Sequence, residues 1–181
     1  IPNTYEMYWN TSAIVFFNSM KKDYDNFCTN ARRQKAHQQE LTPVQVSILA
    51  SIVQSETKQD AEKPRVAGVY LNRLRQSWKL EADPTLVYAI GDFSIKRVLN
   101  EYKTIDSPYN TYKYFGLPPG PICLPDISSI DAVLNAENHQ FMYFCAREDM
   151  SGFHAFAKDY NTHLLNAKRY QAELNRRNIK K

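Results

Sequence analysis

One glutamate lies on an apolar helix face, an arrangement that makes a carboxyl group useful as an acid. Glu56 follows Val53 by three residues and Ile52 by four, so a helix through this segment places all three on one side. Partial burial penalises the charged form of a carboxyl group and raises its pKa, which allows a glutamate to donate a proton near neutral pH. The structural alternative is a glutamate at a helix end whose side chain swings into water.

A second group of informative side chains lies in the segment 107–125, where prolines and glycines exclude regular helix or central strand. Sugar sites need flat apolar faces beside amide and hydroxyl groups, and this segment supplies both. The candidates are Tyr109, Asn110, Thr111 and Tyr112, with Tyr88, Trp78 and Tyr114 as further aromatic faces. The alternative is that these tyrosines and prolines only pack together to hold a long loop still.

Three other residues are candidates by type. Asp83 is the main rival to Glu56 as a catalytic carboxylate, although an aspartate directly before Pro84 favours a helix-capping role. Arg73 and His154 have side chains suited to facing substrate carboxylates or a developing charge. His154 lies close to Phe153 and Phe156, so a core or rim position is the simpler interpretation of it.

Several classes of function have no support in the sequence. Cys28, Cys123 and Cys145 are an odd number in unrelated contexts, which argues against a disulfide framework or a zinc site. There is no glycine-rich phosphate loop and no nucleophile-elbow motif. We therefore expect no metal and no cofactor. The net charge is +4, and the basic tail at 168–181 fits a solvated helix better than a nucleic-acid surface.

The apolar periodicity and capping signals predict mostly helices. Thr42, Pro43 and Gln45 form a capping-box signal with proline at the first helical position. The expected elements are a strand at 4–9, helices at 13–33, 43–58, 64–76, 83–91, 128–135 and 161–175, and strands at 141–146 and 154–157 with a turn at 151–152.

These elements predict an α+β fold, a single mixed domain with several helices and a small sheet. We divide it into an N-terminal strand-helix arm at 1–40 and a core at 41–181. The 181 residues are enough to bury a core with a shaped pocket. The longest apolar run, Ala13–Phe17, is far too short to cross a bilayer, and the start of the chain shows no export signal.

Several motifs in a fixed order resemble the MltG or YceG-like endolytic murein transglycosylase family. The resemblance covers nearly the whole chain, from the arm to His163. The motifs are ASIVQSET at 50–57, VAGVYLNRL at 66–74, DPT at 83–85, SPYNTY at 107–112, GLPPGPI at 116–122, FMYF at 141–144 and HAF at 154–156.

The resemblance implies an enzyme that cuts the MurNAc–GlcNAc bond within peptidoglycan strands and leaves 1,6-anhydroMurNAc ends. It assigns the catalytic acid to Glu56, the second acidic position of the family pattern; the first is Gln54 in this chain, which leaves one carboxylate. It also makes Thr85, within the DPT motif, a substrate-binding candidate beside Asp83, Tyr88, Arg73, His154 and the loop residues.

The resemblance also implies a setting. We expect glycan strands as substrate, cell-wall synthases as possible partners and no nucleic acid. The expected location is the cell envelope, at the periplasmic face of the inner membrane, with attachment only through a membrane segment absent from this chain. Two alternatives remain open: a peptidoglycan-binding module that does not cut, and a hydrolytic muramidase in which water captures the sugar.

Overall fold

The chain is described here by a computed structural model that covers residues 2–95 and 98–177. Its elements in chain order are α1 (Ala13–Phe27), α2 (Asn30–Gln38), α3 (Pro43–Glu56), α4 (Lys63–Arg75), α5 (Asp83–Ile90), the 3-10 helix η1 (Asn100–Thr104), α6 (Ile127–Leu134), β1 (Tyr143–Ala146), β2 (His154–Ala157) and α7 (Tyr160–Arg176). Within these two ranges, seven α-helices and one antiparallel strand pair confirm the α+β class.

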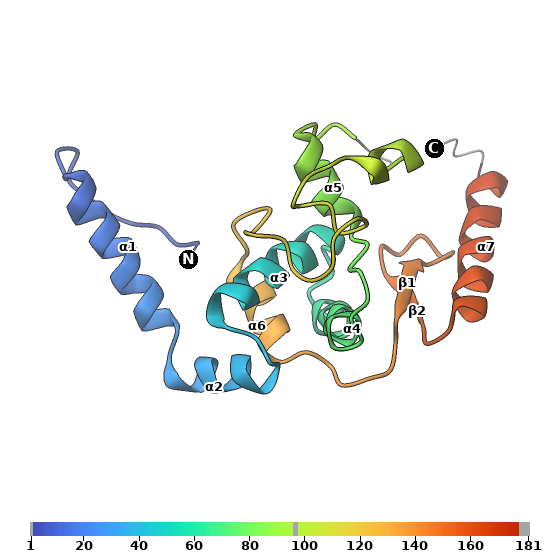
Figure 1. Ribbon diagram of the computed structural model, residues 1–181, viewed down its shortest axis with the longest axis horizontal. Coiled ribbons are helices and arrows are strands. Elements are labelled where there is room, and N and C mark those ends of the chain that lie inside the picture. The colour runs from blue at the N-terminus through green and yellow to red at the C-terminus, as the bar shows by residue number, and fades with distance from the viewer. Residues whose placement is uncertain (1, 96–97, 178–181) are drawn as a thin grey trace.

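Helix α3 lies at the centre of the molecule and packs against α4, α5 and α6 (Figure 1). Buried side chains surround it, because Val46 and the unbroken run 48–53 are all buried. Val44, expected on the apolar stripe, lies in the first turn and is exposed. A helix enclosed by three others holds its C-terminal residue, Glu56, in a fixed place.

The start of α3 confirms the capping box. The Thr42 hydroxyl accepts from the Gln45 amide at 3.2 Å, and the Gln45 side chain accepts from the Thr42 amide at 2.8 Å. The end of α5 also follows expectation, with Gly91 in the left-handed conformation at φ 79°. The start of α6 does not: its cap residue is Asp126, two residues before the expected Ser128.

The N-terminal arm differs most from the expectation. Residues 4–9 form no strand, and Trp9 is 97% exposed. The helix expected at 13–33 is broken at Cys28, and Thr29 caps the second piece through the Arg32 amide. Helix α1 buries none of its residues and projects from the body (Figure 1). Helix α2 packs on α3 and α6. The division of the domain into an arm at 1–40 and a core at 41–181 stays a prediction.

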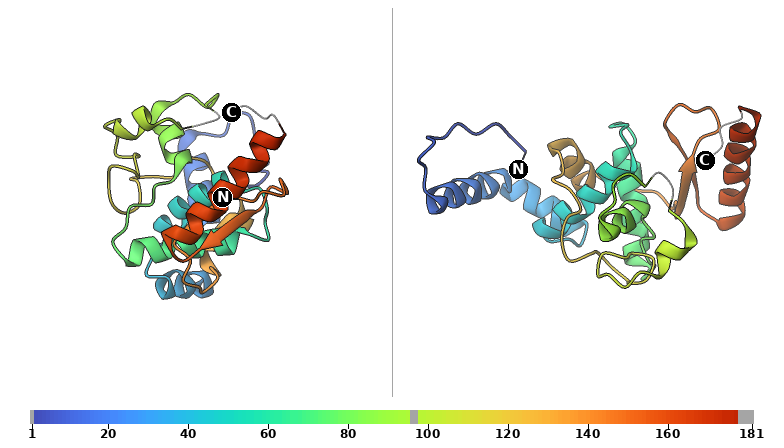
Figure 2. Two further views of the ribbon diagram at one scale, coloured as in Figure 1. Left: turned by 90° about the vertical axis from the view of Figure 1, so that its right-hand side faces the viewer. Right: turned by 90° about the horizontal axis from the view of Figure 1, so that it is seen from above.

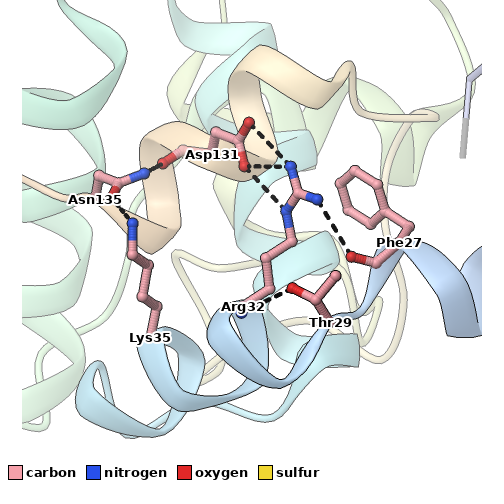
Figure 3. Close-up of polar contacts among 6 residues, drawn as sticks. All are labelled: Phe27, Thr29, Arg32, Lys35, Asp131 and Asn135. Atoms are coloured by element: carbon pink, nitrogen blue, oxygen red, sulfur yellow. Dashed lines mark hydrogen bonds and ion pairs between the residues drawn. The ribbon is translucent and has the colours of Figure 1, made fainter.

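The root of the arm is fixed to α6 by polar contacts (Figure 3). The Arg32 guanidinium donates to both carboxylate oxygens of Asp131, and Lys35 donates to the Asn135 side chain at 2.6 Å. The same guanidinium lies 3.9 Å from the centre of the Phe27 ring and donates to the Phe27 carbonyl. These contacts tie α2 to the helix that packs most closely on α3.

The sheet and α7 occupy the end of the molecule opposite the arm (Figure 2). Strands β1 and β2 pair antiparallel with Phe144 opposite Phe156, and α7 packs against both. Gly152 takes a positive φ of 79° in the connection, as expected of a turn. In the part of the chain that the structure describes, no helix has the length and apolar character needed to cross a membrane.

One buried serine ties the irregular segment 105–126 to α3. The Ser51 hydroxyl donates to the Ile48 carbonyl at 2.7 Å and accepts from the Ile122 amide at 3.0 Å. Both Ser51 and Ile122 are buried, so no water can replace the serine oxygen. This bond fixes the loop that carries Cys123 beside the end of α3.

Replacing Ser51 by Ala leaves the Ile122 amide buried without an acceptor. We expect a loss of roughly 1–3 kcal/mol in the free energy of unfolding, measured by urea denaturation. Ser47→Ala is the control, because Ser47 is only partly buried and its hydroxyl donates to a carbonyl of its own helix at 3.3 Å. Equal stability of the two variants would contradict this role for Ser51.

Candidate active site

Glu56 is the last residue of α3, and its carboxyl group meets a hydroxyl from α4. The Tyr70 hydroxyl donates to Glu56 Oε1 at 2.5 Å. Tyr70 is 1% exposed, and its ring packs edge-on against Phe144 of β1, with centroids 5.9 Å apart. The sequence analysis did not single out Tyr70, because this contact depends on the packing of α4 against α3.

The surroundings of Glu56 hold a proton on it near neutral pH. Burial of the carboxyl group is the largest effect and raises its pKa from the ordinary 4.5 to about 7. The hydrogen bond from Tyr70 and the charge of Arg73 oppose this rise, whereas the negative charge of Asp83 adds to it. Glu56 as a whole residue is partly exposed.

Glu56 lines an open cleft of about 490 Å³ between the end of α3 and helix α5. Its lining combines two carboxylates with apolar and aromatic faces. From α3 come Ser55 and Glu56, from α5 come Asp83, Pro84, Val87 and Tyr88, and from the connecting segments come Phe93, Ile95, Val98, Ile122 and Cys123. The sequence analysis singled out Glu56, Asp83 and Tyr88 but not Ser55, Phe93 or Cys123.

Asp83 does not cap α5, which corrects the expectation. The cap residue is Ala82, Asp83 is the first helical residue, and no side-chain cap bond is formed. Instead Asp83 is exposed, lines the cleft and accepts from the Tyr112 hydroxyl at 2.5 Å. The cleft therefore contains a second carboxylate, which Gln54 had seemed to exclude.

Gln54 faces away from the cleft. Its side-chain oxygen accepts from the Asp126 amide at 2.6 Å and from the Ser129 hydroxyl at 3.1 Å, at the start of α6. A glutamate would accept both bonds equally well and would suit a helix N-terminus. Gln54 is not among the residues that line the cleft.

Two tyrosines present aromatic surface near the cleft. The rings of Tyr88 and Tyr109 lie 4.7 Å apart between centroids, and Tyr88 lines the cleft. A Cβ on Gly120 would come within 2.9 Å of the Tyr109 hydroxyl oxygen, so the loop can approach this ring only with glycine there. Trp78 lies elsewhere, packed edge-on against Tyr143.

Asn110, Thr111 and Thr85 are buried and bond within the protein. The side-chain nitrogen of Asn110 donates to the Lys103 and Ile105 carbonyls. Its side-chain oxygen accepts from the backbone amides of two loop residues. The Thr111 hydroxyl accepts from the Ala82 amide at 3.0 Å and lies 2.8 Å from the Thr85 hydroxyl. These three side chains shape the loop and fix it to α5.

Arg73 and His154 also have protein partners. The buried Arg73 guanidinium donates to the carbonyls of Met142 and Leu80, which joins α4 to β1 and to the segment before α5. His154 Nδ1 lies 2.8 Å from an oxygen of the buried Glu62. The structure brings Arg73 close enough to influence the Glu56 pKa, whereas His154 does not line the cleft.

No metal site accompanies these groups in the described ranges, where no three His, Cys, Asp or Glu side chains lie together as ligands. The three cysteines are free. Cys123 lies at the cleft, with its sulfur 3.8 Å from the Ser55 hydroxyl oxygen.

The arrangement of α3, α4, α5 and the loop agrees with known proteins. The model of the YceG-like family matches residues 1–169. The chain belongs to the YceG-like family. A crystal structure of a yceG-like protein from Listeria monocytogenes superposes on 91% of this chain and 53% of its own, with a TM-score of 0.78 and 31% sequence identity.

Two relatives of this YceG-like chain carry a functional name. A protein of Bacillus subtilis strain 168, named endolytic murein transglycosylase, is 37% identical over 127 residues, which are 70% of this chain and 34% of that protein. A protein of the same name from Streptococcus pneumoniae serotype 2 (strain D39) is 33% identical over 110 residues, 59% of this chain and 20% of its own. The chain thus spans about a third of the first relative and a fifth of the second.

The raised pKa of Glu56 predicts a pH-dependent stability. Because the folded pKa of about 7 exceeds the ordinary 4.5, the folded state binds the proton more tightly than the unfolded state. The resulting stabilisation is complete below the unfolded pKa and is lost as the pH rises through about 7. Glu56→Gln removes the charge at every pH, so we expect its Tm to exceed that of the wild type by about 4 °C at pH 8 and by less at pH 5.

Scanning calorimetry at the two pH values measures this difference. Glu101→Gln is the control, because Glu101 is exposed on η1 and its replacement should leave Tm nearly unchanged at both. A Glu56→Gln difference that is the same at pH 5 and pH 8 would rule out a buried, proton-holding carboxyl group.

Proposed function

We propose that this chain carries the catalytic site of an endolytic lytic transglycosylase that cuts the MurNAc–GlcNAc bond within peptidoglycan strands. The observation that carries the proposal is Glu56: a carboxyl group with a pKa of about 7, lining an open cleft with aromatic and apolar walls. An acid with its pKa near the working pH is suited both to donate and to accept a proton. The names of the relatives supply the substrate class.

In the proposed reaction Glu56 acts twice. Its proton passes to the glycosidic oxygen as the bond between that oxygen and the MurNAc anomeric carbon breaks. The MurNAc 6-hydroxyl then attacks the anomeric carbon and gives its proton to the Glu56 carboxylate. The products are a 1,6-anhydro end and a free GlcNAc 4-hydroxyl, and Glu56 regains its first state. No water is consumed, so positioning of the 6-hydroxyl supplies much of the rate.

Tyr70 positions the Glu56 carboxyl group in this scheme. Its hydroxyl occupies Oε1, which leaves Oε2 as the oxygen that can face the sugar. It also favours the carboxylate and so keeps the pKa from rising further. The ring, held by Phe144, allows this hydroxyl little freedom.

The remaining predicted site residues take two kinds of role in the proposal. Tyr88 and Tyr109 offer ring faces to the sugars, as amphipathic aromatic groups do. Asn110, Thr111 and Thr85 act from within, by holding the loop against α5. Arg73 tunes the charge around Glu56. His154 lies outside the cleft lining, and a role at a more distant part of a strand remains a prediction.

The proposed substrate places the protein in the cell envelope. We propose the periplasmic face of the inner membrane as its working position, with attachment through a segment outside this chain. Cell-wall synthases are proposed partners because they produce the strands that such an enzyme cuts.

Product analysis tests the reaction directly. Purified glycan strands incubated with the wild type should give fragments with 1,6-anhydroMurNAc ends, identified by mass spectrometry. Glu56→Gln should reduce their formation at least 1,000-fold, because Gln cannot transfer the proton, while Glu101→Gln leaves it unchanged. Reducing ends would identify a hydrolytic muramidase, which the second carboxylate in the cleft makes the principal alternative. Unchanged strands would identify a binding module.

The pH profile tests Tyr70. Tyr70→Phe removes the hydrogen bond that favours the Glu56 carboxylate, so the pKa rises and the alkaline limb of kcat/KM moves to higher pH by about 0.5–1 unit. Tyr160→Phe, an exposed ring on α7, is the control and should leave the profile in place. A limb that stays fixed or moves to lower pH in Tyr70→Phe would show that Tyr70 does not tune the proton of Glu56.

A further inference from the structure

The Asp83 residue lines the cleft, and its side chain does not cap α5. Its one hydrogen bond from a side chain in the described part of the chain comes from Tyr112, and the residue is exposed to the cleft. The negative charge of Asp83 acts on Glu56, because it raises the pKa of the Glu56 carboxyl group.

Tyr112 is held so that its hydroxyl reaches Asp83. The Tyr112 amide donates to the Asn110 side chain at 3.0 Å, and the Lys103 ammonium lies 4.7 Å from the centre of the tyrosine ring. The neighbouring Thr111 is buried and is bonded to the start of α5. Burial and the bond to Asp83 keep the pKa of the Tyr112 hydroxyl far above its usual range, so it remains a donor.

The cleft thus contains two carboxylates, and each accepts a hydrogen bond from a tyrosine. Four titratable or charged side chains interact electrostatically with Glu56. They are Tyr70 and Arg73 from α4, Asp83 from α5 and Tyr112 from the loop. The charge of Asp83 favours a protonated Glu56. Enzymes that cleave glycosidic bonds use such a pair of carboxyl groups. One keeps its proton and donates it to the leaving oxygen, and the other stabilises the sugar cation.

We propose that Asp83 is a second catalytic carboxylate, which contacts the MurNAc ring and stabilises the positive charge that develops there, and that Tyr112 is its positioning residue. This inference rests on the proposed function. Asp83 forms no covalent bond and transfers no proton. The anomeric carbon exchanges its bond to the GlcNAc oxygen for a bond to its own O6, and the two protons pass through Glu56 alone.

The charge of Asp83 acts on the transition state more than on the bound sugar, because only the transition state is cationic. Asp83→Asn should therefore lower kcat by about 10- to 100-fold and leave KM within about threefold. It also removes the like charge beside Glu56, so the alkaline limb of kcat/KM should move to lower pH, opposite to the shift in Tyr70→Phe. Tyr112→Phe retains the charge, so its kcat should fall by a smaller factor with the limb in place.

The chain provides a matched control outside the cleft. The Tyr114 hydroxyl donates to Asp106 at 2.5 Å, the same contact as between Tyr112 and Asp83, and both residues are exposed. Asp106→Asn should leave kcat, KM and the pH profile unchanged. Loss of activity in this variant equal to the loss in Asp83→Asn would overturn the inference.

A binding measurement gives a readout apart from turnover. An iminosugar of N-acetylglucosamine configuration is cationic at neutral pH, whereas a chitooligosaccharide is neutral. In calorimetric titrations, Asp83→Asn should weaken binding of the iminosugar about tenfold and change binding of the chitooligosaccharide by less than about twofold. Equal weakening of both ligands would indicate a general contact and overturn the charge-specific role.

The controls separate this inference from the proposed function. If the wild type produces no anhydro ends, or if Glu56→Gln retains activity, the proposed function fails and the role of Asp83 fails with it. If the wild type is active and Asp83→Asn keeps its kcat, its pH limb and its iminosugar affinity, only the inference about Asp83 is overturned. Melting temperatures of the variants show that each is folded; Tyr112→Phe and Asp83→Glu provide further variants should Asp83→Asn not fold.

Discussion

The hydrogen bond between Tyr70 and Glu56 joins helix α4 to helix α3. The proposed chemistry of the cleft depends on the position and the burial of the Glu56 carboxyl group at this helix interface. Helix α3 is enclosed by α4, α5 and α6, so its last residue cannot move far. Burial favours a neutral carboxyl group, and the hydroxyl of Tyr70 favours an ionised one. Together with the charges of Asp83 and Arg73, these two effects give a pKa of about 7.

The rest of the structure can be understood as support for this balance. Arg73, one turn after Tyr70, joins α4 to β1 and brings a positive charge near the carboxyl group. Gln54, two residues before Glu56, accepts from the Asp126 amide and the Ser129 hydroxyl at the start of α6 and so joins α3 to α6. Ser51 bonds the loop that closes the cleft. Helix α6, the two-stranded sheet and the irregular segment 105–126 thus all help to hold Glu56 in place.

Most of the helices could be predicted from local signals, because those signals act within one turn. The capping box at Thr42 and Gly91 at the end of α5 are examples. The failures depend on contacts distant in the sequence. In the described ranges the sheet consists of β1 and β2 alone, so residues 4–9 do not belong to it. The cap of α6 is Asp126, whose amide donates to the side chain of Gln54, more than seventy residues earlier.

The site could be predicted in part for the same reason. The position of Glu56 on an apolar face follows from helical spacing alone, whereas its partner Tyr70 comes from the packing of α3 on α4. The sequence around Asp83 gives the opposite lesson, since Asp-Pro usually caps a helix. In this fold the loop offers Asp83 the hydroxyl of Tyr112 instead, and the side chain turns to the cleft. Asn110 and Thr111, expected to meet sugar, are buried because the loop itself needs their hydrogen bonds.

The central claim is that Glu56 holds a proton up to neutral pH in the folded protein. A carbon-13 NMR titration that follows the side-chain carboxyl carbon of Glu56, assigned by comparison with Glu56→Gln, measures this directly. The account predicts a midpoint near pH 7. A midpoint near the ordinary 4.5 would contradict it, because Glu56 would then be ionised throughout the range in which it is proposed to donate its proton.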